Sequence, residues 1–378
     1  MCAACSQSFD ASAPGSRNAA VAVSADTVHD ALKLTGRGVR IAVLDTGIDV
    51  EHPDLRDAVV AQHCFTQGDC PPSRSDESSQ AQDDNGHGSH VAGIIAARGL
   101  LAGVGVAPGA ELIAVKVSDH TDSGVESDWV AGLSWIYDNR HALGVRLVNI
   151  SVASDALYDS AQPCDPELPA LAEAVQHLVA AGVAVFAASG NRGSPTALSA
   201  PACITGVVSV GAVYDADAGN QPADAPSYAA RWGERFAACR DRDAKRDQIA
   251  CFTNSSQRLD LAAPGTAIVS DDLMGSTAAY WGTSQACPVA TGVAALMLEC
   301  NPTLAPADIK RVLVRTGRTS VDSKNRLEFP TVRALPAVLA ACPELQAKLP
   351  AAGMSDAHYV DAAYSGEDTL NHRFAAGR

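Results

Sequence analysis

The pattern of apolar and polar residues alternates between two kinds of segment along most of the chain. Short, continuously apolar runs are typical of buried strands, and segments with apolar residues every three or four positions are typical of helices. Strands and helices in regular alternation predict a mostly parallel central sheet flanked by helices on both faces. We therefore expect an α/β fold, a three-layer sandwich, with strands at residues 39–44, 111–117, 145–151, 183–188, 206–213, 259–263 and 267–270 and helices at 128–140, 168–178 and 305–315.

One further helix is predicted to lie in the core, because the stretch 289–298 is apolar on every side. Its N-terminus carries unpaired N–H groups and a partial positive charge. The hydroxyl of Ser284 is held at this end of the helix and could attack a substrate carbonyl. The negative charge that develops on the carbonyl oxygen would be stabilised by the hydrogen-bond donors there. Pro288 is expected near the first turn, where a missing N–H costs little. Most serines at such a position only cap the helix, so this stretch alone does not indicate a reaction.

The regular pattern covers residues 21–342, which we expect to form one domain. Residues 1–20 are small and polar and are expected to be a loose leader, and residues 343–378 are expected to be a tail without periodicity. Polar, turn-rich stretches within the domain are predicted to be surface insertions, at about residues 62–85, 153–167 and 215–256.

The composition excludes several classes of partner. A net charge of −15 argues against nucleic acid. The longest apolar runs, 178–188 and 289–298, are too short to span a bilayer. A nucleotide-binding α/β protein is set aside, because no phosphate-cradling glycine-rich loop follows the first strand.

The cysteines bear on the compartment. Cys64 and Cys70 are close together in a polar stretch, as are Cys239 and Cys251, and exposed paired cysteines suit an oxidising compartment. Residues 1–20 lack the basic start and apolar core of a secretory signal. Either a targeting segment is missing from the sequence, or these are free thiols in a cytoplasmic protein. We expect the former, a secreted or periplasmic protein.

Candidate catalytic residues follow a strand or open a helix at separate places in the chain. Asp45 ends the strand at 39–44, His87 lies between glycines before a small-residue helix, and Ser284 opens the core helix. A serine hydroxyl is a weak nucleophile and needs a base, and the base needs a carboxylate to fix its tautomer. Asn191, after the strand at 183–188, is a candidate donor for an oxyanion. Each of these residues on its own is equally consistent with a turn or a helix cap. The prediction of a catalytic site therefore depends on their occurring together.

A metal centre is not expected from the same residues. His90 lies one helical turn after His87, but no third ligand lies nearby in the sequence. Cys2 and Cys5 have metal-ligand spacing without a second such pair. We therefore expect no metal and no cofactor to be required for the chemistry.

Around these residues the sequence resembles the subtilisin-like serine peptidases. The matching pieces are IAVLDTGID around Asp45, NGHGSHVAG around His87, ASGN ending at Asn191 and GTSQACP around Ser284. The order Asp, His, Ser is that of subtilisin itself, which adds consistency. The resemblance covers residues 21–342 and is nearest to a bacterial secreted branch of the family.

The resemblance implies a serine endopeptidase that hydrolyses polypeptides through an acyl-enzyme on Ser284. Asp45 would orient His87, the general base and acid, and Asn191 and the backbone N–H of Ser284 would form the oxyanion hole. Two alternatives stay open. One is an inactive relative that binds peptides in the same groove, against which the intact set of residues argues. The other is transfer of the acyl group to an amine, as in peptide-cyclising relatives. We expect a monomer.

The resemblance also implies that an extended peptide adds as a strand between two edges, 123–125 and 151–153. Ala153 replaces the family's usual glycine and adds a methyl group facing the first specificity pocket. Arg192 could favour an acidic or polar side chain just before the scissile bond, unless its charge simply faces water. The expected substrate-binding residues are Gly124, Ser151, Ala153 and Arg192, and the acidic residues that would favour basic side chains further upstream are Asp119, Asp122, Glu126 and Asp128.

Other family features carry over in part. Relatives often hold a structural calcium on a carboxylate like Asp54 and an Asn-rich loop, but the loop 98–103 supplies almost no side-chain oxygen, so that site is expected to be lost. Calcium elsewhere stays open. The family's N-terminal propeptide is not seen in this sequence, which suggests an incomplete or mature sequence, or a variant that folds without one. The disulfides implied are Cys64–Cys70, Cys239–Cys251 and Cys164–Cys203, with Cys287 a buried apolar filler.

Overall fold

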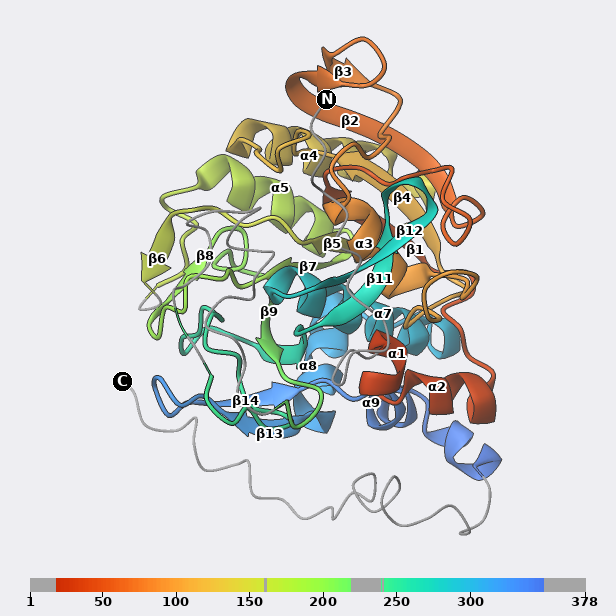
Figure 1. Cartoon of the computed structure of the whole chain (residues 1–378), viewed down its shortest axis with the longest axis vertical. Helices are drawn as coiled ribbons and strands as arrows, with labels where there is room; N and C mark the ends of the chain where they lie inside the picture. Colours follow the sequence, from red (N-terminus) through yellow and green to blue (C-terminus); the bar gives the residue numbers. More distant parts are fainter. Residues whose placement is uncertain (1–17, 160–161, 219–238, 240, 350–378) are drawn as a thin grey trace.

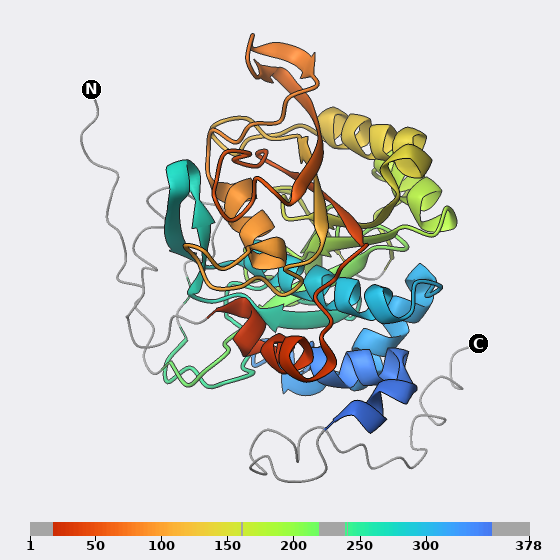
Figure 2. The ribbon, with the colours of Figure 1, turned by 90° about the vertical axis from the view of Figure 1, so that its right-hand side faces the viewer.

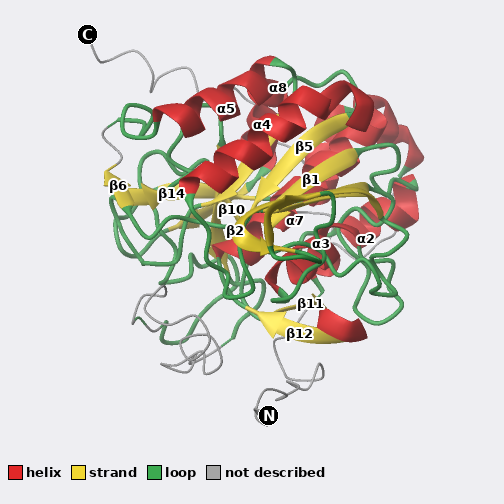
Figure 3. Cartoon of the chain, turned by 90° about the horizontal axis from the view of Figure 1, so that it is seen from above, coloured by secondary structure: helices red, strands yellow, loops and turns green. Residues whose placement is uncertain are grey.

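A ten-stranded sheet runs through the middle of the computed structural model, which describes residues 18–159, 162–218, 239 and 241–349 (Figures 1 and 3). Its strand order is β13-β14-β10-β9-β7-β5-β1-β4-β2-β3. The strands are β1 (Arg40–Asp45), β2 (Val59–Cys70), β3 (Ser75–Ser78), β4 (Glu111–Lys116), β5 (Val145–Ile150), β7 (Ala184–Ala188), β9 (Val208–Val213), β10 (Leu261–Pro264), β13 (Arg318–Val321) and β14 (Glu328–Thr331).

Neighbouring strands from β2 to β14 pair in parallel, and antiparallel pairing is confined to the outermost pairs, β2–β3 and β13–β14. The expected mostly parallel sheet is therefore confirmed. Two small antiparallel pairs lie outside it, β6 (Leu157–Asp159) with β8 (Ala197–Ser199) and β11 (Ile268–Asp272) with β12 (Ser276–Tyr280).

Helices cover both faces of the sheet (Figures 2 and 3). Alternation along β1 shows the two layers: Ile41 and Val43 pack into the core that contains α3 and α7, whereas Ala42 and Leu44 pack into the core that contains α4 and α5. The helices are α3 (His87–Ala96), α4 (Glu126–Leu143), α5 (Pro169–Ala180), α7 (Thr283–Cys300), α8 (Pro306–Thr316) and α9 (Ala334–Ala341), with the short α1 (Ala19–Ala22), α2 (Ala25–Thr27), η1 (Val28–Leu32), η3 (Leu273–Gly275) and η4 (Pro343–Lys348).

The stretch 62–85 is not the loop that the sequence predicts. β2 continues the parallel sheet beyond β4, and β3 folds back on β2, so the segment forms a hairpin at the sheet edge (Figure 1). Polar residues are tolerated there because much of an edge hairpin faces water. The expected insertion at 153–167 contains β6. Residues 219–238 and 240 of the expected insertion at 215–256, the leader up to residue 17 and the tail from residue 350 lie outside the described residues.

The core helix α7 is buried almost throughout, as predicted from its apolar sequence. Pro288, however, lies in the second turn rather than the first. A residue there would normally donate its N–H to the carbonyl of Ser284. That carbonyl instead accepts a hydrogen bond from Ser151 Oγ at 2.9 Å. Because Pro288 has no N–H, the Ser284 carbonyl oxygen can accept the Ser151 hydroxyl, and this hydrogen bond links the start of α7 to the end of β5.

The described cysteines form disulfides with one exception. The three expected pairs, Cys64–Cys70, Cys164–Cys203 and Cys239–Cys251, are confirmed. A fourth, Cys300–Cys342, was not predicted and joins the end of α7 to the end of α9. Cys287 is free and fully buried, and burial raises the pKa of its thiol, as suits an inert core residue. Among the described helices, none is long and apolar enough to cross a membrane.

Candidate active site

Asp45 and His87 meet where β1 ends and α3 begins. Asp45 Oδ1 accepts hydrogen bonds from His87 Nδ1 at 2.7 Å and from the backbone N–H of Thr46 at 2.8 Å. Because a carboxylate can only accept, Nδ1 of His87 carries the proton and Nε2 is the acceptor in the neutral ring. Burial opposes the charged imidazole, but Asp45, with smaller contributions from Asp122 and Asp83, raises the pKa of His87 to about 9.

Glycine permits this close approach of a strand end to a helix start. A Cβ on Gly88 would lie 2.0 Å from the carbonyl oxygen of Gly47 and 3.1 Å from Cβ of Asp45. Gly47 has φ +106°, and a Cβ there would lie 2.5 Å from the carbonyl oxygen of Ala81. Both positions therefore require glycine if the imidazole is to reach the carboxylate.

Ser284 lies in the first turn of α7, next to the end of β5. Its Oγ donates to the carbonyl oxygen of Ser151 at 2.7 Å, while Ser151 Oγ donates back to the Ser284 carbonyl. Asn149 steadies the arrangement: its amide donates to Ser151 Oγ at 3.0 Å and accepts from Thr291 Oγ1 at 3.0 Å. Ser151, directly after β5, thus positions the Ser284 hydroxyl.

Asn191 follows β7 and faces the start of α7. Its Oδ1 accepts hydrogen bonds from both the backbone N–H and Oγ1 of Thr283, each at 2.9 Å. Since the oxygen is committed to Thr283, the amide N–H groups are the part of the side chain left for a ligand. The backbone N–H of Ser284, in the first turn of the helix, has no intrahelical acceptor. These two donors lie on the same cleft as Ser284 Oγ.

A cleft joins these residues to both expected peptide edges. Its lining includes Gly124 from the loop after β4 and Ala153 from the segment after β5. A Cβ on Gly124 would lie 2.6 Å from the Val117 carbonyl oxygen, so this edge is built on a close backbone approach. The same cleft is lined by four more of the predicted site residues, Ser151, Asn191, Arg192 and Ser284, but not by Asp45 or His87.

Known proteins resemble this chain in sequence and in fold. The model of the subtilase family matches residues 36–375, most of the chain. Subtilisin Savinase of Lederbergia lenta is 36% identical over 293 residues, which cover 77% of this chain and 87% of the relative.

The chain belongs to the subtilase family.

Further relatives extend the comparison. Subtilisin E of Bacillus subtilis (strain 168) is 34% identical over 286 residues, 75% of this chain but only 61% of that protein. A solved cold-adapted subtilisin-like serine proteinase superposes with a TM-score of 0.61 at 25% identity, covering 80% of this chain and 90% of that one. By class this subtilase is therefore a serine endopeptidase, with the three-layer α/β fold expected.

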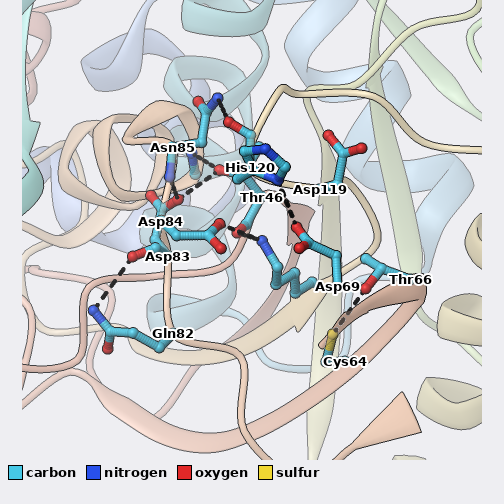
Figure 4. A network of polar contacts seen from close by, with 12 residues as sticks. Thr46, Cys64, Thr66, Asp69, Gln82, Asp83, Asp84, Asn85, Asp119 and His120 are labelled. Carbon is cyan, nitrogen blue, oxygen red and sulfur yellow. Dashed lines mark hydrogen bonds and ion pairs between the residues drawn. The ribbon is translucent and has the colours of Figure 1, made fainter. Parts of the chain in front are cut away.

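A polar network that the sequence did not predict supports the backbone around the pair of Asp45 and His87 in this subtilase (Figure 4). The fully buried Lys116 ends β4 and donates to the carbonyl oxygen of Thr46 at 2.8 Å and to Asp84 Oδ1 at 2.7 Å. In the sequence, this network was indicated only by a lysine at the end of an apolar run. Asp83 accepts from five donors: Thr46 Oγ1, the backbone N–H groups of Asn85, Gly86 and Ser89, and Ser89 Oγ.

The same network reaches the β2–β3 hairpin. Asn85 Oδ1 accepts the backbone N–H of His87 at 3.1 Å, and Asn85 Nδ2 donates to the His120 carbonyl at 3.0 Å. His120 in turn donates its backbone N–H to Asp69 on β2 at 2.9 Å. The hairpin thus contacts the loop that carries His120 (Figure 4).

Arg192 lies on the cleft, but its charge is offset. Its Nη2 forms an ion pair with Asp155 Oδ1 at 2.7 Å. The expected preference for an acidic substrate residue depends on this guanidinium, which Asp155 already neutralises. That preference stays a prediction.

His90, the second histidine of the motif, is not a catalytic partner. It is fully buried, stacks on Tyr280 with ring centroids 4.1 Å apart, and contacts the carbonyl oxygens of Ile268 and Ala278 through Nε2. Burial, with the nearby His87, lowers the pKa of His90 to about 3, so its ring stays neutral and structural.

Asp54 does not fit the family's calcium position in this chain. Its carboxylate accepts the backbone N–H groups of Leu100, Leu101 and Ala102. Burial opposes ionisation, but these donors outweigh it and lower the pKa of Asp54. Calcium needs oxygen ligands, whereas this loop presents N–H groups, so the loop itself stabilises the carboxylate.

Proposed function

We propose that this subtilase hydrolyses peptide bonds in polypeptides through a covalent acyl-enzyme on Ser284. The observation that supports this best is the 2.7 Å hydrogen bond from His87 to the buried Asp45. The bond fixes the tautomer in which His87 Nε2 carries no proton and can accept one. Asp122, which lines the same cleft as Ser284, has a carboxylate oxygen within 4.8 Å of a ring nitrogen of His87.

In the first step, the Ser284 hydroxyl turns from the Ser151 carbonyl towards His87 Nε2. As Oγ attacks the scissile carbonyl carbon, its proton passes to Nε2 and the carbonyl electron pair moves onto oxygen. The imidazolium that forms is stabilised by Asp45. It then gives its proton to the leaving amine as the C–N bond breaks, which leaves the acyl group on Ser284. Water, activated by His87, completes the hydrolysis.

The oxyanion is held by Asn191 and by the backbone N–H of Ser284. The bonds from Thr283 to Asn191 Oδ1 support this role, because they occupy the oxygen of a residue that lines the cleft and leave its amide N–H groups as the donors. Donors fixed before the reaction cost no reorganisation when the negative charge develops. Asp45, His87, Ser284 and Asn191 therefore form the proposed catalytic machinery.

An extended peptide would bind between the edges at 123–125 and 151–153 through main-chain hydrogen bonds. Gly124 leaves the first edge open to a backbone, and Ala153 and Arg192 would line the pocket for the residue before the scissile bond. We propose no metal and no cofactor for the chemistry, and a monomer as the working form. The four disulfides favour an extracellular location, and we propose secretion or export to the periplasm.

The experiment is digestion of one defined peptide in H₂¹⁸O, with and without a competing amine, followed by mass spectrometry of the products. Hydrolysis predicts a new carboxyl terminus that carries one ¹⁸O. Products joined to the amine, even at low amine concentration, would instead show acyl transfer. Intact peptide that co-elutes with a folded protein would show a binding module without catalysis.

A further inference from the structure

The loop between β4 and α4 holds Asp122 in a fixed backbone conformation. Asp119 Oδ1 accepts the backbone N–H groups of Thr121 and Ser123 and the hydroxyl of Thr121, at 2.7–2.9 Å. The backbone N–H of Asp122 donates to the Asp119 carbonyl at 2.9 Å. Asp122 itself has φ +60°, a conformation that Asp and Asn tolerate better than most residues.

This conformation brings Asp122 to the catalytic histidine. One carboxylate oxygen of Asp122, one of Asp45 and one ring nitrogen of His87 all lie within 4.8 Å of one another. Oδ1 of Asp122 is buried, and the residue lines the same cleft as Ser284. A second carboxylate thus faces His87 from the loop that carries the first substrate edge.

The expected peptide path leads past this carboxylate. Successive side chains of an extended peptide point to opposite sides. If the residue before the scissile bond points into the pocket at Ala153 and Arg192, the residue upstream of it points the other way. Asp122 lies beside His87 on the loop of the first edge, and its carboxylate is the group that such a side chain would meet.

The charges on the cleft favour a cation there. The charged residues that line it are Asp122, Glu126 and Asp155, against Arg192 alone. Arg192 is paired with Asp155, so the remaining charge is negative and lies on the side of the first edge. A basic side chain beside Asp122 would gain a charge-assisted hydrogen bond at a partly buried carboxylate.

We propose that Asp122 is a specificity-determining residue, whose carboxylate binds a lysine or arginine side chain two residues before the scissile bond. The assignment rests on the proposed function, since it needs a peptide bound for attack by Ser284.

The test compares three peptides that differ only at that position, with lysine, its neutral analogue norleucine, or glutamate. For the wild type we expect kcat/KM to be about tenfold higher for lysine than for norleucine, and lower still for glutamate. In Asp122→Asn the lysine-to-norleucine ratio should fall to about one, because asparagine keeps the backbone conformation and loses the charge. In the wild type, 1 M salt should reduce the ratio, which a purely structural role would not explain.

Glu126→Gln is the matched control, because it removes an acidic charge from the same cleft. Its ratio should stay near that of the wild type. An equal loss in both variants would show a diffuse field and overturn the assignment, as would a ratio that persists in Asp122→Asn. Equal cleavage of all three peptides by the wild type would overturn the role of Asp122 but not the proposed function. If the folded protein cleaved none of the peptides, both the role of Asp122 and the proposed function would be overturned.

Discussion

His87 Nδ1 lies 2.7 Å from Oδ1 of Asp45, and both side chains are buried. Burial disfavours a charged imidazole, but the carboxylate outweighs it and raises the pKa of His87 to about 9. A general base must be neutral to accept a proton. This pair therefore connects the geometry of the site to the pH at which it works.

The first prediction is the pH profile of kcat/KM for an uncharged peptide. The neutral fraction of His87 rises as the pH approaches its raised pKa, so the rate should increase about tenfold per pH unit and level off above about pH 9. Asp122→Asn should move the midpoint to lower pH, because it removes one carboxylate that favours the imidazolium. A wild-type midpoint near 6.5, the ordinary value, would contradict this account.

The second prediction concerns the oxyanion hole. Asn191→Leu should lower kcat about a hundredfold to a thousandfold with little change in KM, because the lost donor acts on charge that develops in the transition state. Thr283→Val is the control, since it removes the hydroxyl that holds Asn191 Oδ1 but leaves the amide donors in place. A smaller loss is expected for it. Equal losses in both variants would mean that Asn191 acts only by holding the start of α7.

The third prediction concerns Asp271, which is fully buried. One of its carboxylate oxygens lies within 4.8 Å of a carboxylate oxygen of Asp54 and of a ring nitrogen of His52. Burial, followed by the charge of Asp54, raises the pKa of Asp271 to about 8. The folded protein therefore keeps a proton that the unfolded chain has lost, so stability falls as pH rises between the ordinary value near 4 and about 8. The slope from this group is on the order of 1 kcal/mol per pH unit.

Asp271→Asn should remove that part of the pH dependence, because the amide cannot lose its proton. Thermal unfolding of both proteins from pH 5 to pH 9 measures this pH dependence. The unfolding temperature of the variant should rise relative to that of the wild type as the pH rises. Parallel curves would show that Asp271 is ionised throughout.

The fourth prediction concerns the disulfide that the sequence did not indicate. Cys300–Cys342 closes a separation of 42 residues, whereas Cys64–Cys70 closes only 6. In the loop-entropy account, replacing the first pair by serine should lower the free energy of unfolding by about 2 kcal/mol more than replacing the second. Denaturant unfolding of the two double variants measures the difference. An equal or reversed order would show that native-state packing, rather than loop length, decides the effect.

Much of the fold and of the candidate site could be predicted because each signal was local. Asp45, His87 and Ser284 each stand at a strand end or helix start, and β1 and α7 have sequences that only a buried strand or helix would carry. Glycines beside Asp45 and His87 marked the places where backbones approach closely.

The missed features depend on contacts between distant segments. The β2–β3 hairpin is polar, so nothing in its own sequence separates an edge hairpin from a loop. Lys116 and Asp83 are single charged residues whose role exists only once Thr46 lies beside them. Asp122 looked like one of several acids on an exposed edge, and only the folded loop shows that it faces His87.

Reaction with a fluorophosphonate, followed by peptide mapping of the adduct, tests whether Ser284 is a nucleophile activated by His87. We expect a single adduct on Ser284, which forms faster at alkaline pH and is nearly absent in a folded His87→Ala variant. An adduct on another residue, or no adduct on well-folded protein with an open cleft, would contradict it.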